Sequence, residues 1–238
     1  MKYLIKILIV TISTALLIAC SEEKEVELVY SNKGNSSYRV ILGKELLKLP
    51  EFSSEDYRRI MFDSFSEHSE YILYETDVVF DKDLNLDNIK GYAGVVVIGN
   101  LDVKESIIKF SDDGAIHLFV TGKANAKNLI ITDGVYHFAG LTVSNISLVQ
   151  PYIGEININN FESKILITNE YYSGIESSEK FKFYFEFDNE KDNKYLEQLL
   201  VKHYSKNTEH LVENKIGSFL IKDPKLIKDF TEEIRNNF

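Results

Sequence analysis

The chain has 238 residues, of which 44% are hydrophobic and 27% charged, and it contains three prolines and one cysteine. This composition supports a substantial packed core and argues against disorder, except in a few residues near the N-terminus. A single cysteine excludes a disulfide within one chain. The formal net charge of −10 disfavours binding to nucleic acid or to anionic lipid headgroups. It leaves open whether the acidity attracts basic partners or only keeps the protein soluble.

The N-terminus carries the pattern of an export signal. Lys2 and Lys6 form a short basic start, and the apolar run from Leu4 to Ala19 is shorter than the roughly 20 apolar residues that a membrane-spanning helix needs. Polar residues after Cys20 end the run abruptly. We therefore expect residues 1–19 to be a cleaved signal peptide. An uncleaved transmembrane helix and a soluble export signal with a chance cysteine are the alternatives.

The end of this run, Leu17, Ile18, Ala19 and Cys20, resembles the lipobox of bacterial lipoproteins. The resemblance implies that a signal peptidase recognises the first three residues and that Cys20 receives a diacylglyceryl thioether and a further acyl chain, which together anchor stably. It implies no cofactor besides this covalent lipid. Ser21 resembles the residue that directs enteric lipoproteins to the outer membrane, so we expect an envelope location, facing the periplasm in a Gram-negative host. Cleavage would change the net charge from −10 to −12 because it removes two lysines and no acid.

Residues 20–75 are predicted to form an α+β cap. Residues 26–30 and 38–42 have the composition of two strands around a polar turn at 31–35. Ser53 is placed to cap a helix, with Asp56 three residues later, and apolar residues at helical spacing predict a helix over 54–67.

The middle of the chain is organised by repetition. Each copy is a short strand, a small turn residue, another alternating strand and then a second apolar burst, with a period of roughly 18 to 23 residues. The four copies begin with residues 95–103, 118–126, 136–143 and 156–163, and an earlier, degraded copy is expected at 78–86. A repeat this short cannot bury its own apolar face, so the copies must stack. The sequence therefore predicts a mainly β fold, a short right-handed parallel β-helix of about four to five coils over residues 76–175.

The small turn residues are expected to occupy the corners of this β-helix. Gly99, Gly122 and Gly140 would stand where a side chain clashes or where φ must be positive, and Asn160 would replace glycine in the last copy. The register of the third copy is open by one residue. Along each strand, side chains should alternate between the interior and the outside, so Leu118 and Val120 are expected to point inward and to alternate with His117 and Phe119.

The repeat segment resembles the bactofilin-like group of small bacterial β-helix proteins in its glycine corner followed by Leu-x-Val. It also resembles an uncharacterised group in the run Ala126–Ile130 and in the turn Tyr152–Gly154. The likeness covers about residues 77–172 and implies an architecture rather than an activity. Bactofilins polymerise end to end through bare β-helix ends, and the long flanks of this chain argue against that behaviour.

Residues 176–238 are predicted to form a second α+β cap. Phe181, Phe183, Phe185 and Phe187 alternate with polar residues and Tyr184, which predicts a strand with one aromatic face. That face is either a core strand sealing the last coil or a carbohydrate platform. Helices are expected at about 192–204 and 224–236.

The candidate functional residues lie in or beside the coils. Asp112 and Asp113 form an acidic pair in a loop, where carboxylates could bind calcium, although the cluster is sparse and Asp-Gly is common in turns. His117 and His137 lie about two residues out of register on adjacent coils, and no third ligand for a zinc ion is obvious. Phe119 is expected to face outward with them, as is Tyr184 of the C-terminal strand. Asp112, Asp113, His117, Phe119 and His137 together form the predicted binding surface.

No sequence motif identifies a reaction, so a non-enzymatic binding or scaffold module anchored to the membrane is the favoured function. One version is an immunity-type lipoprotein that binds a basic protein. The alternative is an envelope glycan enzyme resembling the polysaccharide lyases, with Lys109, Lys123 or Lys127 as the base. Nucleic acid is not an expected partner.

Overall fold

The structure is a computed structural model, and it describes residues 37–52, 67–111, 116–150, 154–168 and 181–186, with residues 189, 191–192, 194–196, 198 and 232–234. The strand predicted at residues 26–30 and the helix predicted at 54–67 lie outside the described residues, the last position of that helix excepted. Cys20, Asp112 and Asp113 also lie outside them.

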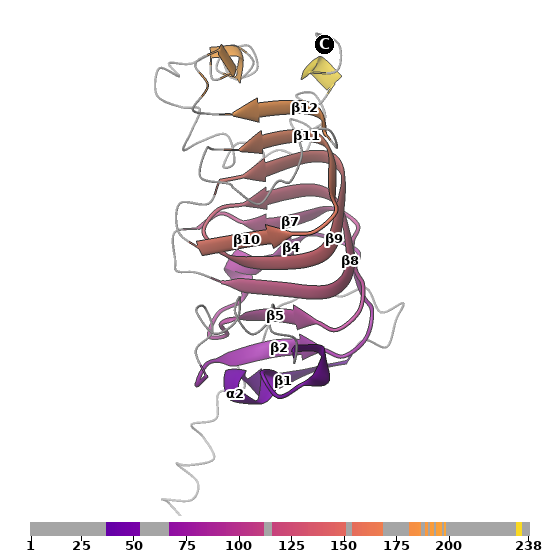
Figure 1. The fold of residues 1–238 in the computed structure, drawn as a ribbon, viewed down its shortest axis with the longest axis vertical. Coiled ribbons are helices and arrows are strands. Elements are labelled where there is room, and N and C mark those ends of the chain that lie inside the picture. Colours follow the sequence, from indigo (N-terminus) through magenta and orange to yellow (C-terminus); the bar gives the residue numbers. More distant parts are fainter. Residues whose placement is uncertain are drawn as a thin grey trace, which may run out of the picture.

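The described chain is a parallel β-solenoid of about five turns, as the repeats predict (Figure 1). Each turn passes through three strand positions, which we call the first, second and third face. The first face contains β2 (Glu70–Tyr74), β5 (Gly94–Val97), the start of β8 (His117–Ile131), the start of β9 (Gly134–Val149) and β10 (Gly154–Ile158).

The other two faces continue the same turns. The second face contains β3 (Val78–Phe80), β6 (Leu101–Val103), the middle of β8 and β9, and the start of β11 (Phe161–Thr168). The third face contains β4 (Leu84–Asn85), β7 (Ser106–Lys109), the ends of β8, β9 and β11, and finally β12 (Phe181–Glu186). A 3-10 turn, η2 (Leu86–Asn88), follows β4.

The N-terminal flank turns back on the first coil. β1 (Tyr38–Leu42) is a strand where the sequence predicts one, and it pairs antiparallel with β2. It leads into a single helical turn, α2 (Gly43–Leu46), and a 3-10 turn, η1 (Pro50–Phe52). At the other end, the described residues between 191 and 198 and at 232–234 are helical, in agreement with the two predicted C-terminal helices.

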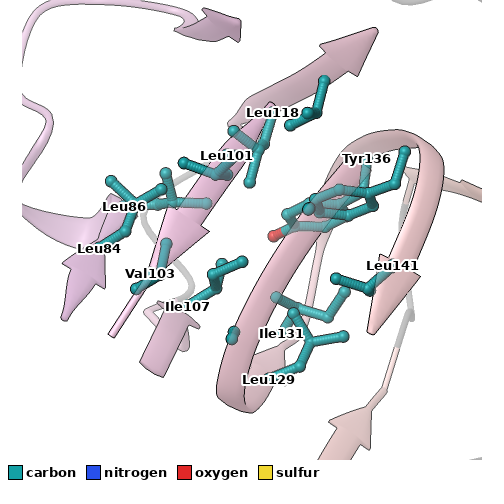
Figure 2. Close-up of a cluster of buried hydrophobic side chains, with 14 of the residues drawn as sticks. Leu84, Leu86, Leu101, Val103, Ile107, Leu118, Leu129, Ile131, Tyr136 and Leu141 are labelled. Carbon is teal, nitrogen blue, oxygen red and sulfur yellow. The ribbon is translucent and has the colours of Figure 1, made fainter. Parts of the chain in front are cut away.

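Alternating side chains fill the interior of the solenoid, as Figure 2 shows. Leu118 and Val120 belong to this interior cluster, which confirms their predicted direction. The cluster runs through every coil, because the aligned positions of successive turns are mostly Leu, Ile, Val, Phe or Tyr, and the stack buries what one turn cannot. Its labelled members include Leu84, Leu101, Leu118, Tyr136 and Leu141.

The first coil begins earlier than predicted. Val78 pairs with Leu101, so residues 78–80 are the second strand of their turn, and the strand that aligns with Gly94–Val97 is the segment from Tyr71 to Tyr74. The sequence alignment was wrong by one strand because both segments are short apolar runs of similar composition.

The corner residues behave in three different ways. Gly99 has a φ of 133° and Asn160 a φ of 48°, which confirms the positive backbone angles expected there. At Gly122 a Cβ would lie 2.5 Å from the Gly99 carbonyl oxygen, so close approach alone requires glycine. The prediction that Gly140 also needs glycine, for its backbone angle or for lack of space, was wrong. A Cβ at that position would meet nothing nearer than Lys123 Cγ at 3.6 Å.

A one-residue shift in the pairing of β8 with β9 explains why Gly140 differs from the other corner glycines. Gly140 pairs with Lys123 rather than with Gly122, because the register between β8 and β9 is irregular between Val120 and Lys123. The fourth turn therefore uses one residue fewer at this corner, and its glycine falls one position further along. This resolves the register that the sequence left open.

The aromatic strand near the C-terminus joins two layers rather than presenting one aromatic face. Phe181 and Tyr184 pack against the interior cluster, and Phe181 meets Phe161 edge-to-face at 5.1 Å between ring centroids. Phe185 is buried and stacks on Tyr195 of the helical segment at 5.7 Å. β12 is thus a core strand that continues the third face, and Phe187 lies outside the described residues.

Candidate functional site

Three of the five predicted surface residues are not on the surface. His117, Phe119 and His137 do point outward from the solenoid, but they are 6%, 0% and 5% exposed. The expectation that they are accessible was wrong because the N-terminal flank covers the first face. Ile41, Leu46 and Phe52 of that flank form a second hydrophobic cluster with Phe119 on the outer side of the sheet.

Aromatic stacking organises this covered row. The Tyr71 ring stacks on His117 at 5.7 Å between centroids, and its hydroxyl lies 3.0 Å from His117 Nδ1. The Phe119 ring stacks on His137 at 6.1 Å. His117 pairs with Val135, which confirms that the two histidines are two residues out of register.

Burial lowers the pKa of both His117 and His137 from 6.5 to about 4, so both imidazoles are neutral at pH 7. Among the described residues, no group of three or more His, Cys, Asp or Glu side chains is placed to hold a metal ion. The row is therefore an internal packing layer, with two ionisable groups in it, and not an exposed metal or ligand site.

A second polar cluster lies at the corner after the third face. Lys109 is 2% exposed, and its ammonium lies 3.2 Å from an Asp87 carboxylate oxygen and donates to the backbone carbonyl and, at 3.1 Å, to the hydroxyl of Ser111. Asp87 also accepts bonds from the Ser111 hydroxyl at 2.7 Å and from the amides of Phe110 and Ser111.

The hydrogen bonds to Asp87 keep its carboxylate ionised, and this decides the role of Lys109. Burial acts to raise the pKa of the Asp87 carboxyl, but the hydrogen bonds from Ser111 and Phe110 outweigh it and leave that pKa below its usual 3.8. A carboxylate that stays ionised holds Lys109 as its counter-ion. Lys109, one of the three lysines considered as a lyase base, is therefore part of a structural ion pair that joins two coils.

The other two candidate lysines are on the second face. Lys127 is ion-paired with Glu105 at 2.6 Å, and Lys123 is exposed. The geometry therefore sets neither of these two lysines apart as a base.

The second face is the exposed face of the solenoid. Its outward residues alternate with buried ones, as in β8, where exposed Lys123, Asn125 and Lys127 alternate with buried Ala124 and Ala126. The face also carries ion pairs between Asp102 and Lys104 and between Glu105 and Lys127. One row crosses all five turns through the register partners Val79, Asp102, Asn125, Thr142 and Glu162.

The last coils are hollowed where the second face meets the third face. A depression of about 510 Å³ opens between β9, β11 and β12, and it is lined by Thr142, Val143, Ser144, Glu162, Ser163, Lys164 and Lys182. The sequence did not single out these residues, because the strands that carry them are brought together only by the register of the last turns. The 22- to 24-residue spacing of Asp87 to Lys109 and Ser111 matches the repeat period and is the signal that would have found the buried corner.

The fold and the exposed face define the class of this protein as a parallel β-solenoid with a covered first face and an open, polar second face. No protein-family model, curated protein or solved structure matches the chain. In the described part of the chain, no helix is both long and apolar enough to cross a membrane.

Proposed function

We propose that the chain is a bacterial envelope lipoprotein, tethered through Cys20, whose bactofilin-like solenoid is a non-enzymatic scaffold that binds a protein partner on the second face. The observation that supports this most is the exposure of that face over all five turns, while the first face is covered. A row of regularly spaced polar side chains on a stiff sheet suits binding, because it costs little conformational entropy to form a contact.

The chemistry of the described residues favours binding over catalysis. Lys109 and Asp87 form an ion pair with each other, and His117 and His137 are buried. The formal charge of −10 favours a basic partner by long-range attraction. On the second face itself acids and lysines are interspersed, so the partner is selected there by matched hydrogen bonds and ion pairs rather than by charge alone.

The proposal is tested with a photo-crosslinking residue in the full chain, produced in bacterial cells. Positions Asp102 and Asn125 lie on the second face, and exposed Lys48 near the N-terminal flank is the control position. We expect a discrete crosslinked envelope protein of basic charge at the first two positions, and Asn125→Arg should abolish the product formed from position 102. The same products at Lys48, or none at Asp102 and Asn125, would count against the scaffold.

A further inference from the structure

The hollow between the second and third faces of the last coils contains two lysines at neighbouring positions. The register pairs Ser163 with Phe181 and Ile165 with Phe183, which places Lys164 of β11 directly beside Lys182 of β12. Adjacent strands are about 4.8 Å apart, so the two lysine side chains leave the backbone at neighbouring positions on one side of the sheet. Both side chains are exposed at the hollow.

Like charges at neighbouring cross-strand positions repel and cost stability. Elsewhere in the coils, Lys104, Lys109 and Lys127 each have a carboxylate partner. Neither Lys164 nor Lys182 forms an ion pair with a described residue, and the Lys182 ammonium lies 5.2 Å from the centre of the Phe183 ring. In an acidic chain, this is a local concentration of positive charge without an internal counter-ion among the described residues.

Most of the remaining surface of the hollow is apolar, and hydrogen-bonding groups lie within it. Thr142 and Ser144 contribute exposed hydroxyls from β9, and Glu162 contributes a carboxylate two residues before Lys164. Two ammonium groups and one carboxylate leave a net charge of +1, which matches a monoanion better than a dianion. Hydroxyls and a carboxylate are the groups that bind sugar hydroxyls, and a volume of about 510 Å³ is in the range of small-ligand sites.

We propose that this hollow binds a carboxylated sugar unit, a uronic acid within a saccharide, with its carboxylate between Lys164 and Lys182. The sugar hydroxyls then bond to Glu162 and to the hydroxyls of Thr142 and Ser144. Each contact between an ammonium and the carboxylate is charge-assisted, and its loss leaves the anion with one donor fewer. The inference rests on the hollow alone and requires neither the lipid anchor nor a protein partner.

The test is titration calorimetry of the full chain in detergent with three probes: a galacturonic acid trisaccharide, a galactose trisaccharide and inorganic phosphate. We expect the uronate probe to bind with a dissociation constant of about 1 mM or tighter, with affinity falling as salt rises. The Lys164→Gln and Lys182→Gln variants should each lose about tenfold or more in affinity. The matched control, Lys123→Gln, removes an exposed lysine of the same face outside the hollow and should bind as the unchanged protein does.

Folding is checked separately by thermal unfolding without ligand. Because like charges at neighbouring positions repel, the double Lys164→Gln, Lys182→Gln variant should unfold at the same or a higher temperature than the unchanged protein. That result would show that its loss of binding does not come from misfolding. Equal binding of the galactose trisaccharide, equal binding of phosphate, no binding of the uronate probe, or unchanged affinity in the double variant would each overturn the proposal. None of these outcomes depends on the crosslinking result at Asp102 and Asn125.

Discussion

Acidification should destabilise the fold through His117 and His137. Both imidazoles are buried on the outer side of the first face, and burial places their folded-state pKa at about 4 against 6.5 for an exposed histidine. The unfolded chain therefore binds more protons than the folded chain between these two values. The stabilisation is complete above pH 6.5, falls as the pH drops through the window from 6.5 to about 4, and changes little below it.

The size of this loss follows from the two pKa values. Between pH 8 and pH 5, each histidine should lower the free energy of unfolding by about 2 kcal/mol, and the pair by about 4 kcal/mol, before carboxyl groups begin to contribute. Single domains have roughly 5–15 kcal/mol in total, so the change is large enough to measure.

The assay is urea unfolding at pH 8 and pH 5 for the unchanged protein and for three variants. His137→Phe keeps a ring stacked on Phe119 and should remove about half of the loss between the two pH values. His117→Phe should do the same, and it also loses the hydrogen bond between the Tyr71 hydroxyl and His117 Nδ1 at both pH values. His68→Gln alters an exposed histidine and should leave the loss unchanged.

Two results would refute this reasoning. If the free energy of unfolding of the unchanged protein were the same at pH 8 and pH 5, the histidines would not be buried as neutral groups. If His68→Gln reduced the loss as much as His137→Phe, the effect would come from general surface charge and not from the covered row.

Three further predictions concern the coils and the anchor. Gly122→Ala should lower the free energy of unfolding by about 1–3 kcal/mol because the new Cβ meets the carbonyl of the preceding coil, whereas Gly140→Ala, where that space is open, should be tolerated in the same urea titration. Asp87→Asn should cost about 3 kcal/mol or more because it leaves Lys109 buried without its counter-ion, and adding Lys109→Met should restore much of the loss in thermal unfolding. Cys20→Ala should move the protein from the membrane fraction to the soluble fraction with an unchanged circular dichroism spectrum, and continued membrane association of the exported variant would contradict the lipid anchor.

The sequence predicts the stacked coils well because their signal is local. Leu118 and Val120 alternate with their neighbours, and a stack of similar alternations has one way to bury its apolar side. Gly99 is recognisable for the same reason, since its backbone angle is a property of its own turn.

The covered row and the hollow could not be predicted in this way. Whether Phe119 meets water depends on Phe52 and its neighbours, which are far away in sequence and carry no pairing signal. The closeness of Lys164 and Lys182 depends on the register of β11 and β12, and the irregularity between Ser163 and Ile165 in the pairing of β11 with β9 shows that register is not constant through the coils. Long-range packing therefore determines which side chains are exposed, and irregularities in strand register determine which side chains are neighbours. Neither can be read from the repeat pattern.

The direction of β1 has a consequence for assembly. Every other pairing among the described strands is parallel, whereas β1 runs against β2 (Figure 1). A second copy that added its last coil beyond β1 would meet a strand of opposite polarity, with hydrogen bonds in alternating narrow and wide pairs instead of the even, slanted ladder that joins successive turns. The reversed strand therefore ends the parallel ladder at this end of the described stack, and any strand added beyond β1 would join an edge whose polarity differs from that of the coils.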